Sequence, residues 1–331
     1  MAGVAILKPD HLGDLVLSVP AIRAIRARHT EVTLFVAPGS LRLARFLFPD
    51  ISNIHPAPLT HLMRGAGEAL APELLASILD RFEFVFLLRY DPVMQAIAER
   101  LHVRHVVATG DYLTHETNVQ RHAVAPVIGE YSRTKWFGTA AITWPLCLGN
   151  VGLCIAAGFP TNRWPNIYWL ELARRLAALG LMVTLVGGPA ERRDLIALSR
   201  MLARVPHQVI EGGADVGAFL DTLARVDLVV ASDGGTAHLC SLRKPIVSLF
   251  GSSPWRRYAP FGAHNVLLTR DEPCSPCVQF SATEINGCVS RECTALLQPR
   301  QVERVVLSNG IDFSGISGVR IERGVSHRSV S

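Results

Sequence analysis

The chain has 331 residues, 49% of them hydrophobic, and a formal net charge of +5. This composition excludes a disordered protein, because it supplies enough apolar surface for a large core, and the length favours two domains over one. The positive charge favours phosphates, anionic lipid head groups and acidic sugars as partners. It is too small to indicate nucleic-acid binding.

The cellular location is predicted from features that the sequence lacks. No run of 18 or more apolar residues occurs, and the start, MAGVAILKPD, turns polar after the length of one strand. Seven cysteines in a chain of this length do not resemble the dense, even-numbered framework of a small secreted domain. We therefore expect a cytoplasmic protein in a reducing compartment, without a leader or a membrane span.

Short apolar runs alternate with helical patterns in the first part of the chain. The runs are residues 3–8, 31–38, 82–90 and 103–110. Because these runs are nearly continuous rather than alternating, they predict parallel strands covered on both faces. Residues 111–150 contain scattered Gly, Pro and Trp, which predicts a loop and a connector.

A second series restarts the same rhythm at residue 151. Helices are expected at 165–179, 190–203, 216–225 and after 235, between strands at 151–158, 181–188, 207–213, 227–235, 244–251 and 264–270. We therefore predict an α/β protein with two doubly wound domains, 1–150 and 151–309, and a ligand cleft between them at the carboxyl ends of the strands. The sequence from 310 to 331 is expected to be a flexible tail.

The first predicted strand runs into the polar turn PDHLGD, residues 9–14. A carboxylate at the start of the next helix is stabilised in its ionised form by roughly 0.3–1 kcal/mol, so Asp14 is a candidate general base. The alternative is that Asp14 or Ser18 only caps a helix. Pro20 either kinks a helix begun near Asp14 or lies in the first turn of a helix capped by Ser18.

A second candidate site lies in DLVVASDGGTAHL, residues 227–239. Here a strand, a turn of four small or polar residues and a short helix carrying His238 are expected. Glycine amides and a helix N-terminus attract anions, and a diphosphate fits such a turn without a metal ion. The alternative is an ordinary strand-to-helix turn with His238 packed beneath it.

Four late cysteines lie in CSPCVQFSATEINGCVSREC: Cys274, Cys277, Cys288 and Cys293. The first two have the spacing at which two thiolates hold one ion. A structural zinc or iron site and reduced free thiols are both open interpretations, and disulfides are a third. Cys147, Cys154 and Cys240 are expected to be small buried residues.

Two stretches resemble the signatures of glycosyltransferase family 9, the heptosyltransferases of lipopolysaccharide core assembly. They are ILKPDHLGDLVLSVPAIRAIR (6–26) and DGGTAHLCSLRKPIVSLFGSSPWRRYAPFG (233–262). HETNVQR (115–121), GFPTNRWPNIYWLELARRL (158–176) and TLVGGPAERRDL (184–195) lie in the expected order, so the resemblance covers residues 4–307. It implies a GT-B fold, in which an acceptor-binding and a nucleotide-sugar-binding Rossmann-like domain face a central cleft.

The resemblance also implies roles for individual residues. Asp14 corresponds to the base that deprotonates the acceptor hydroxyl for inverting attack on the anomeric carbon of the donor. The implied donor-binding residues are Asp10, His11, Gly13, Arg163, Glu191, Asp233, Gly234, Gly235, Thr236, Ala237 and His238. Gly234 replaces the usual threonine, and Asn162 stands where the family has a phosphate-binding lysine. Arg163 could supply that charge, although neighbouring residues of an extended segment point to opposite faces.

The substrates, too, are implied by the resemblance. The donor would be ADP-heptose, and the acceptor a lipid A-core glycolipid or a protein, handled in the cytoplasm with peripheral contact to the inner membrane. No cofactor is implied for catalysis, and some related protein heptosyltransferases hold iron in a four-cysteine finger. A nucleotide-sugar epimerase of the same architecture and a non-catalytic binding protein for sugar nucleotides or glycans are the alternatives.

Overall fold

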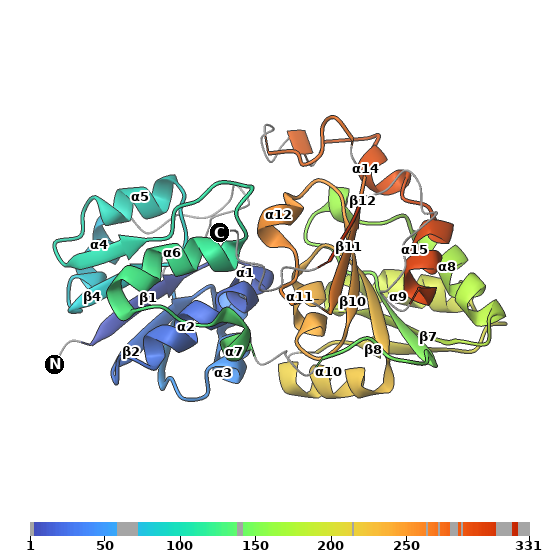
Figure 1. Cartoon of the computed structure of the whole chain (residues 1–331), viewed down its shortest axis with the longest axis horizontal. Helices are drawn as coiled ribbons and strands as arrows, with labels where there is room; N and C mark the ends of the chain where they lie inside the picture. The colour runs from blue at the N-terminus through green and yellow to red at the C-terminus, as the bar shows by residue number, and fades with distance from the viewer. Residues whose placement is uncertain are drawn as a thin grey trace. The chain divides into compact units, whose positions relative to one another are not determined.

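The computed structural model describes residues 3–57, 72–137, 142–213, 215–262, 264–270, 272–278, 284–285, 287–308 and 320–323. The chain divides into two compact units, Met1–Phe137 and Gly138–Ser331, each built around its own sheet (Figure 1). The units divide after Phe137, whereas the predicted boundary is at residue 150, where β6 begins.

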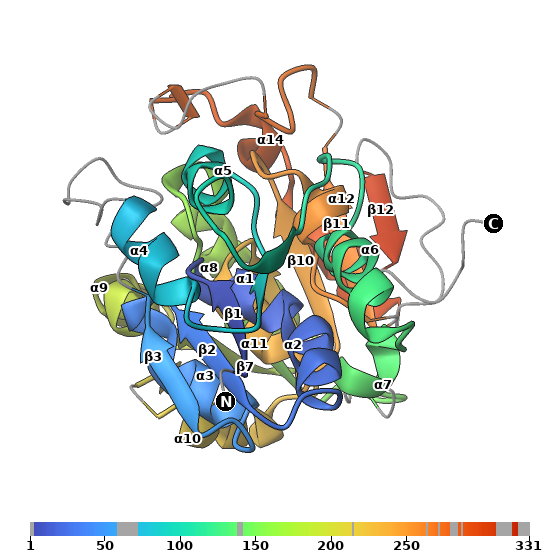
Figure 2. The ribbon, with the colours of Figure 1, turned by 90° about the vertical axis from the view of Figure 1, so that its left-hand side faces the viewer.

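The first unit holds a five-stranded parallel sheet in the order β3-β2-β1-β4-β5. Its strands are β1 (Val4–Lys8), β2 (Val32–Val36), β3 (Asn53–Pro56), β4 (Phe84–Leu87) and β5 (Arg104–Val107). Its helices are α1 (Leu12–Leu17), α2 (Val19–Arg26), η1 (Pro38–Ser40, a 3₁₀ helix), α3 (Leu41–Leu47), α4 (Pro72–Leu79), α5 (Pro92–Ala98), α6 (Glu116–Ile128) and α7 (Arg133–Phe137). Figure 2 shows β3, β2 and β1 side by side, while α2 packs against α6 and α7, and α4 against α5.

The second unit holds a seven-stranded sheet in the order β12-β11-β10-β9-β6-β7-β8, parallel except for the antiparallel pair β11 and β12. Its strands are β6 (Asn150–Cys154), β7 (Met182–Gly187), β8 (His207–Glu211), β9 (Leu228–Ser232), β10 (Ile246–Phe250), β11 (Asn265–Thr269) and β12 (Arg320–Arg323). Its α-helices are α8 (Asn166–Ala178), α9 (Arg192–Met201), α10 (Val216–Thr222), α11 (Gly235–Ser241), α12 (Trp255–Tyr258), α14 (Glu292–Ala295) and α15 (Pro299–Leu307). The 3₁₀ helices are η2 (Pro160–Asn162), η3 (Pro189–Glu191) and η4 (Leu223–Arg225).

The position of a strand in its sheet explains its sequence. Every residue of β1 (VAILK), β9 (LVVAS) and β10 (IVSLF) is buried, because neighbouring strands and covering helices leave no face open to water. The edge strand β8 (HQVIE) buries one residue of its five. The carboxyl ends of the buried strands, where the polar motifs follow, are the usual place for a ligand site in such sheets.

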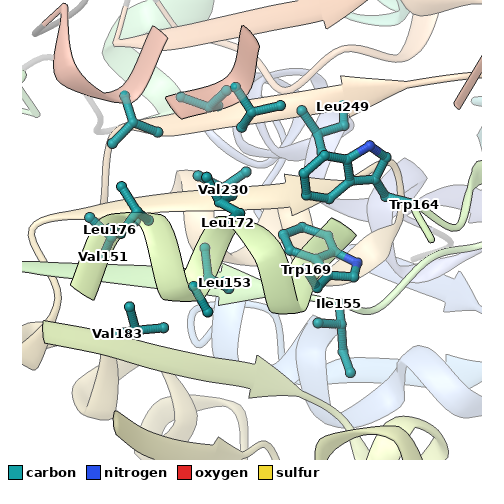
Figure 3. Packing of buried hydrophobic residues seen from close by; sticks show 14 of the residues in the cluster. Val151, Leu153, Ile155, Trp164, Trp169, Leu172, Leu176, Val183, Val230 and Leu249 are labelled. Carbon is teal, nitrogen blue, oxygen red and sulfur yellow. The ribbon is translucent and has the colours of Figure 1, made fainter. Parts of the chain in front are cut away.

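The core of the second unit fixes the segment that leads from η2 into α8. Trp164 and Trp169 are fully buried, with ring centroids 4.8 Å apart in an edge-to-face arrangement (Figure 3). The indole Nε1 of Trp164 donates to the carbonyl oxygen of Leu297 at 2.8 Å, between α14 and α15. Residues 160–164 are therefore anchored to the end of the chain segment that carries the late cysteines.

The predicted fold class is confirmed, and each predicted strand and helix of the second series is present. Three local expectations are wrong. Residues 111–150 contain α6 and α7 rather than only loop, because α6 buries the polar side chains of Glu116, Thr117 and Gln120 and so shows no apolar period. Cys147 is exposed, since it precedes β6, whereas Cys154 and Cys240 are buried. Residues 320–323 of the predicted tail form β12, and the rest of that tail lies outside the described residues.

Candidate active site

Lys8, the last residue of β1, carries a charge into the core of the first unit. Its side chain is 2% exposed, and its ammonium Nζ donates to the carbonyl oxygen of Leu88 at 2.9 Å. The same Nζ lies 2.7 Å from Oδ2 of Asp10 and 3.4 Å from Oε1 of Glu116. A buried ammonium needs such partners, since they replace the water it has lost. Lys8 thereby joins the turn after β1 to β4 and α6.

Asp10 is the centre of this ion network rather than part of an exposed surface. It is 6% exposed and also pairs with the guanidinium of Arg89, which in turn pairs with Asp91, the N-terminal cap of α5. A carboxylate that faced a diphosphate would be repelled by it. The pairing with Lys8 and Arg89 holds the Asp10 carboxylate inside the protein.

The turn after β1 places Asp14 in the first turn of α1. His11 is exposed at the N-cap position, Gly13 is buried and the side chain of Asp14 is half-buried. The helix ends at Leu17, and α2 then begins with Pro20 in its first turn, where a missing amide costs no hydrogen bond. Asp14 therefore belongs to a helix of its own that ends before Pro20.

Ser18, between the two helices, fixes the backbone of Asp14 instead of capping α2. Its hydroxyl donates to the carbonyl oxygen of Asp14 at 2.8 Å and accepts from the amide of Gln120 at 2.9 Å. Gln120 also donates to Oε1 of Glu116 at 2.8 Å. The polar face of α6, which the sequence did not reveal, thus supports both the candidate base and the buried Lys8.

In the second unit, the turn after β9 packs closely against Ala157 and Gly158, in the segment that follows β6. The amide of Gly158 donates to the carbonyl oxygen of Asp233 at 3.1 Å. A Cβ atom on Gly234 would lie 2.9 Å from the nitrogen of Gly158 and 3.1 Å from Cα of Ala157. Because both are backbone atoms, a clash with a Cβ atom at position 234 could not be relieved by the movement of a side chain. The close approach therefore explains why glycine replaces the threonine expected at position 234.

The carboxyl group of Asp233 is held by neutral side chains. Its Oδ2 accepts from Nδ2 of Asn162 at 2.7 Å, and Asn162 is itself fixed by Ser252 and Ser253. Burial raises the pKa of Asp233 to about 6, and a hydrogen bond from Ser253 opposes that shift. A lysine in place of Asn162 would stabilise the ionised carboxylate of Asp233. With the neutral Asn162 there, the Asp233 carboxyl group binds a proton more readily.

The raised pKa of Asp233 predicts a pH dependence of stability. The folded protein keeps this proton up to about pH 6, while the unfolded chain loses it near the ordinary value of 3.8. The stabilisation is therefore complete below pH 3.8 and is lost as the pH rises through 6. In urea unfolding, Asp233→Asn, which cannot ionise, should gain about 2–3 kcal/mol relative to the wild type between pH 4 and pH 7. A pH-independent difference between the two proteins would contradict the assignment.

The other predicted donor-binding residues occupy varied positions. Gly235 and Thr236 are half-buried at the start of α11, whereas Ala237 and His238 are buried within it. Oε2 of Glu191 accepts from the amide of Gly188 at 3.0 Å and so closes the turn after β7.

Arg163 directs its charge away from the Asp233 network. It is exposed, with its guanidinium 3.8 Å from the carboxylate of Asp194, while Asn162 beside it is buried. Asn162 and Arg163 thus point in different directions, as expected, although Asn162 ends a 3₁₀ helix and only Arg163 has extended backbone.

The four late cysteines lie near one another. Burial, and then the charges of the other three thiols, raise the pKa of Cys293 to about 12. Burial and neighbouring thiols also raise the pKa of Cys277. Within the described residues, no three side chains of His, Cys, Asp or Glu are arranged closely enough to hold a metal ion. The donor set itself, four thiols, suits zinc or iron.

Comparisons with known proteins identify the family. The model of the family "Glycosyltransferase family 9 (heptosyltransferase)" matches residues 93–287, more than half of the chain. This chain belongs to glycosyltransferase family 9. The family 9 chain is 23% identical over 290 residues to lipopolysaccharide heptosyltransferase 2 of Escherichia coli K12, covering 76% of this chain and 83% of that protein. It is also 32% identical over 124 residues to lipopolysaccharide heptosyltransferase 1 of Pseudomonas aeruginosa, covering 37% of this chain and about a third (34%) of that relative.

Solved structures confirm that this family 9 chain has the two-domain GT-B fold. The E. coli heptosyltransferase WaaC with ADP superimposes with a TM-score of 0.63 at 16% identity, covering 92% of this chain and 99% of WaaC. The iron-containing dodecameric glycosyltransferase TibC from enterotoxigenic E. coli gives 0.58 at 14% identity, covering 93% and 76%. Among the described residues, no helix of the family 9 chain has the length and apolarity to cross a membrane.

Proposed function

We propose that this glycosyltransferase moves a heptose from ADP-heptose to an acceptor of the lipopolysaccharide inner core, with Asp14 as the general base. The observation that carries the proposal is the half-buried Asp14 in the first turn of the helix that follows the buried strand β1. Its backbone is fixed by Ser18 and α6, as a positioned base requires. The names of the relatives support the sugar and the acceptor.

The proposed reaction is a single displacement at the anomeric carbon of the donor. The Asp14 carboxylate takes the proton of the acceptor hydroxyl, whose oxygen forms a bond to the anomeric carbon of the donor. The bond from that carbon to the diphosphate breaks on the opposite face, so the configuration inverts and ADP leaves.

The turn from Asp233 to Thr236 is the proposed site of the diphosphate. The N-terminal amides of a helix can donate to developing negative charge, and α11 begins at Gly235 in this turn. Gly234 lets the backbone come close to a bound anion. We propose that these amides, rather than a metal ion, stabilise the leaving group, and that Glu191 contacts the nucleoside.

A donor screen with and without acceptor tests the function. Release of ADP from ADP-heptose is expected to require a lipid A-core acceptor, and release from other sugar nucleotides to be slow. Interconversion of the sugar without acceptor would instead support an epimerase. Binding of ADP-heptose without any turnover would support a binding protein. Transfer to a protein but not to the glycolipid would replace the proposed acceptor, and with it the proposed contact with the inner membrane.

We propose further that the four late cysteines bind one structural zinc or iron ion. A single cation would relieve the mutual repulsion of their thiolates, which burial and proximity make unfavourable. The protein purified without chelator should hold about one ion per chain, measured by elemental analysis. The variant Cys274→Ser/Cys277→Ser should hold none, while the exposed Cys147→Ser should keep the ion. A wild-type protein free of both metals, with thiols that react fully with a thiol reagent, would contradict the metal site.

A further inference from the structure

The segment that carries the late cysteines is hydrogen-bonded to the loop that follows β10. We call residues 272–278 and 287–297 the cysteine segment, and residues 251–253 the β10 loop. The hydroxyl of Ser275 donates to the carbonyl oxygen of Gly251 at 2.6 Å. The amide of Cys277 donates to the carbonyl oxygen of Ser252 at 2.8 Å. Two successive residues of the β10 loop are thus held by the cysteine segment.

Packing at Gly251 tightens this contact. A Cβ atom there would lie 2.5 Å from Cγ2 of Thr294, 3.2 Å from the carbonyl oxygen of Thr161 and 3.3 Å from Sγ of Cys293. Gly251 therefore lies between η2 on one side and α14 on the other, with no room for a side chain. The guanidinium of Arg291 adds a second bridge, since it donates to the carbonyl oxygen of Pro160 in η2 at 3.2 Å.

The β10 loop and η2 are also the two segments that hold Asp233. Ser252 donates to Oδ1 of Asn162 from its amide at 3.0 Å and from its hydroxyl at 2.7 Å. Thr161 shares a hydrogen bond of 2.8 Å with the same hydroxyl. Asn162 then donates to Asp233 at 2.7 Å. An unbroken series of short contacts therefore leads from the cysteine segment to the proposed diphosphate turn.

We propose that the cysteine segment sets the geometry of the diphosphate turn, with Ser275 as a positioning residue for donor binding. Ser275 reaches the turn through the β10 loop and Asn162. This role is separate from metal binding, because the contact of Ser275 uses a hydroxyl and that of Cys277 uses a backbone amide. The inference rests on the proposed function in one respect, the assignment of the diphosphate to the turn at Asp233.

The test removes the hydroxyl of Ser275. Ser275→Ala is expected to weaken ADP binding about fivefold, the effect of losing one partly buried hydrogen bond, in a calorimetric titration with ADP. Amide hydrogen exchange of residues 251–253 and 161–163 is expected to become faster in the same variant. Ser275→Thr keeps the hydroxyl and should restore both properties. The matched control is Ser308→Ala, which removes a serine hydroxyl that donates to the carbonyl oxygen of Val305 at the end of α15.

The two readouts separate this inference from the proposed function. If the wild type does not bind ADP, the donor assignment fails, and hydrogen exchange still tests the coupling. Unchanged exchange of residues 251–253 in Ser275→Ala would overturn the inference whatever the ADP affinity. A lower melting temperature with unchanged ADP affinity would show that Ser275 serves only stability, which also overturns it.

Discussion

Replacing Asp14 by asparagine should reduce heptose transfer by about 10²–10⁴-fold, the usual contribution of a positioned general base, while ADP binding stays unchanged. The amide has nearly the shape of the carboxylate but cannot accept the proton of the acceptor hydroxyl. Since Ser18 donates to the backbone carbonyl oxygen of Asp14, which the substitution keeps, the helix should keep its geometry. Initial transfer rates and calorimetric titration with ADP measure the two effects separately.

The control for Asp14→Asn is Asp50→Asn, which makes the same chemical change at an exposed carboxylate of the same unit. Its transfer rate should equal that of the wild type. Transfer by Asp14→Asn at the wild-type rate would show that another group removes the proton. A loss of ADP binding in Asp14→Asn would place the residue in donor binding instead.

Replacing Lys8 by methionine should lower the free energy of unfolding by about 3–5 kcal/mol, as expected when one partner of a buried ion pair is removed. The change leaves the carboxylates of Asp10 and Glu116 buried without the cation that lies 2.7 and 3.4 Å from them. Urea unfolding at neutral pH measures the loss. Adding Glu116→Gln to Lys8→Met should recover part of it, because one of the buried carboxylates that lost the Lys8 ammonium is then removed.

The matched control is Arg26→Met, which also removes a cation from an ion pair of the first unit. Arg26 is half-buried and Asp50 is exposed, so the loss of this pair should cost at most about 1 kcal/mol. Equal stability of Lys8→Met and Arg26→Met would mean that the buried network contributes no more than a surface pair.

The sequence predicted the sheets well because strands buried on both faces appear in it as nearly continuous apolar runs. Strands such as β1 and β10 are apolar except for one residue each, Lys8 and Ser248, and each strand is followed by turn residues that end it. The helix α6 was missed for the opposite reason. Its buried residues mix polar side chains with apolar ones, and it contains Pro126 within its length, so neither an apolar period nor helix propensity indicated the helix. The short edge strand β3, NIHP, contains a proline and buries one residue, and gave no signal either.

The candidate site was predicted in part. Asp14 and Asp233 could be singled out because each lies in a polar turn directly after an apolar strand. Lys8, Arg89 and Glu116 were not predicted as a network, since the partners lie 79 to 108 residues apart and only the folded sheet brings them together. Similarly, nothing in the sequence around Ser275 indicated its contact with Gly251. Side-chain pairs that join distant strands leave no local pattern.

The antiparallel strand β12 closes one border of the second sheet. Its four residues pair with β11, whose own residues (NVLLT) are all buried. A shortened protein that ended before Arg320 would present the backbone amides and carbonyls of an apolar strand to solvent, the arrangement that invites pairing between molecules. Residues 320–323 therefore cover an edge of the second sheet, and removing them should favour association between molecules through β11.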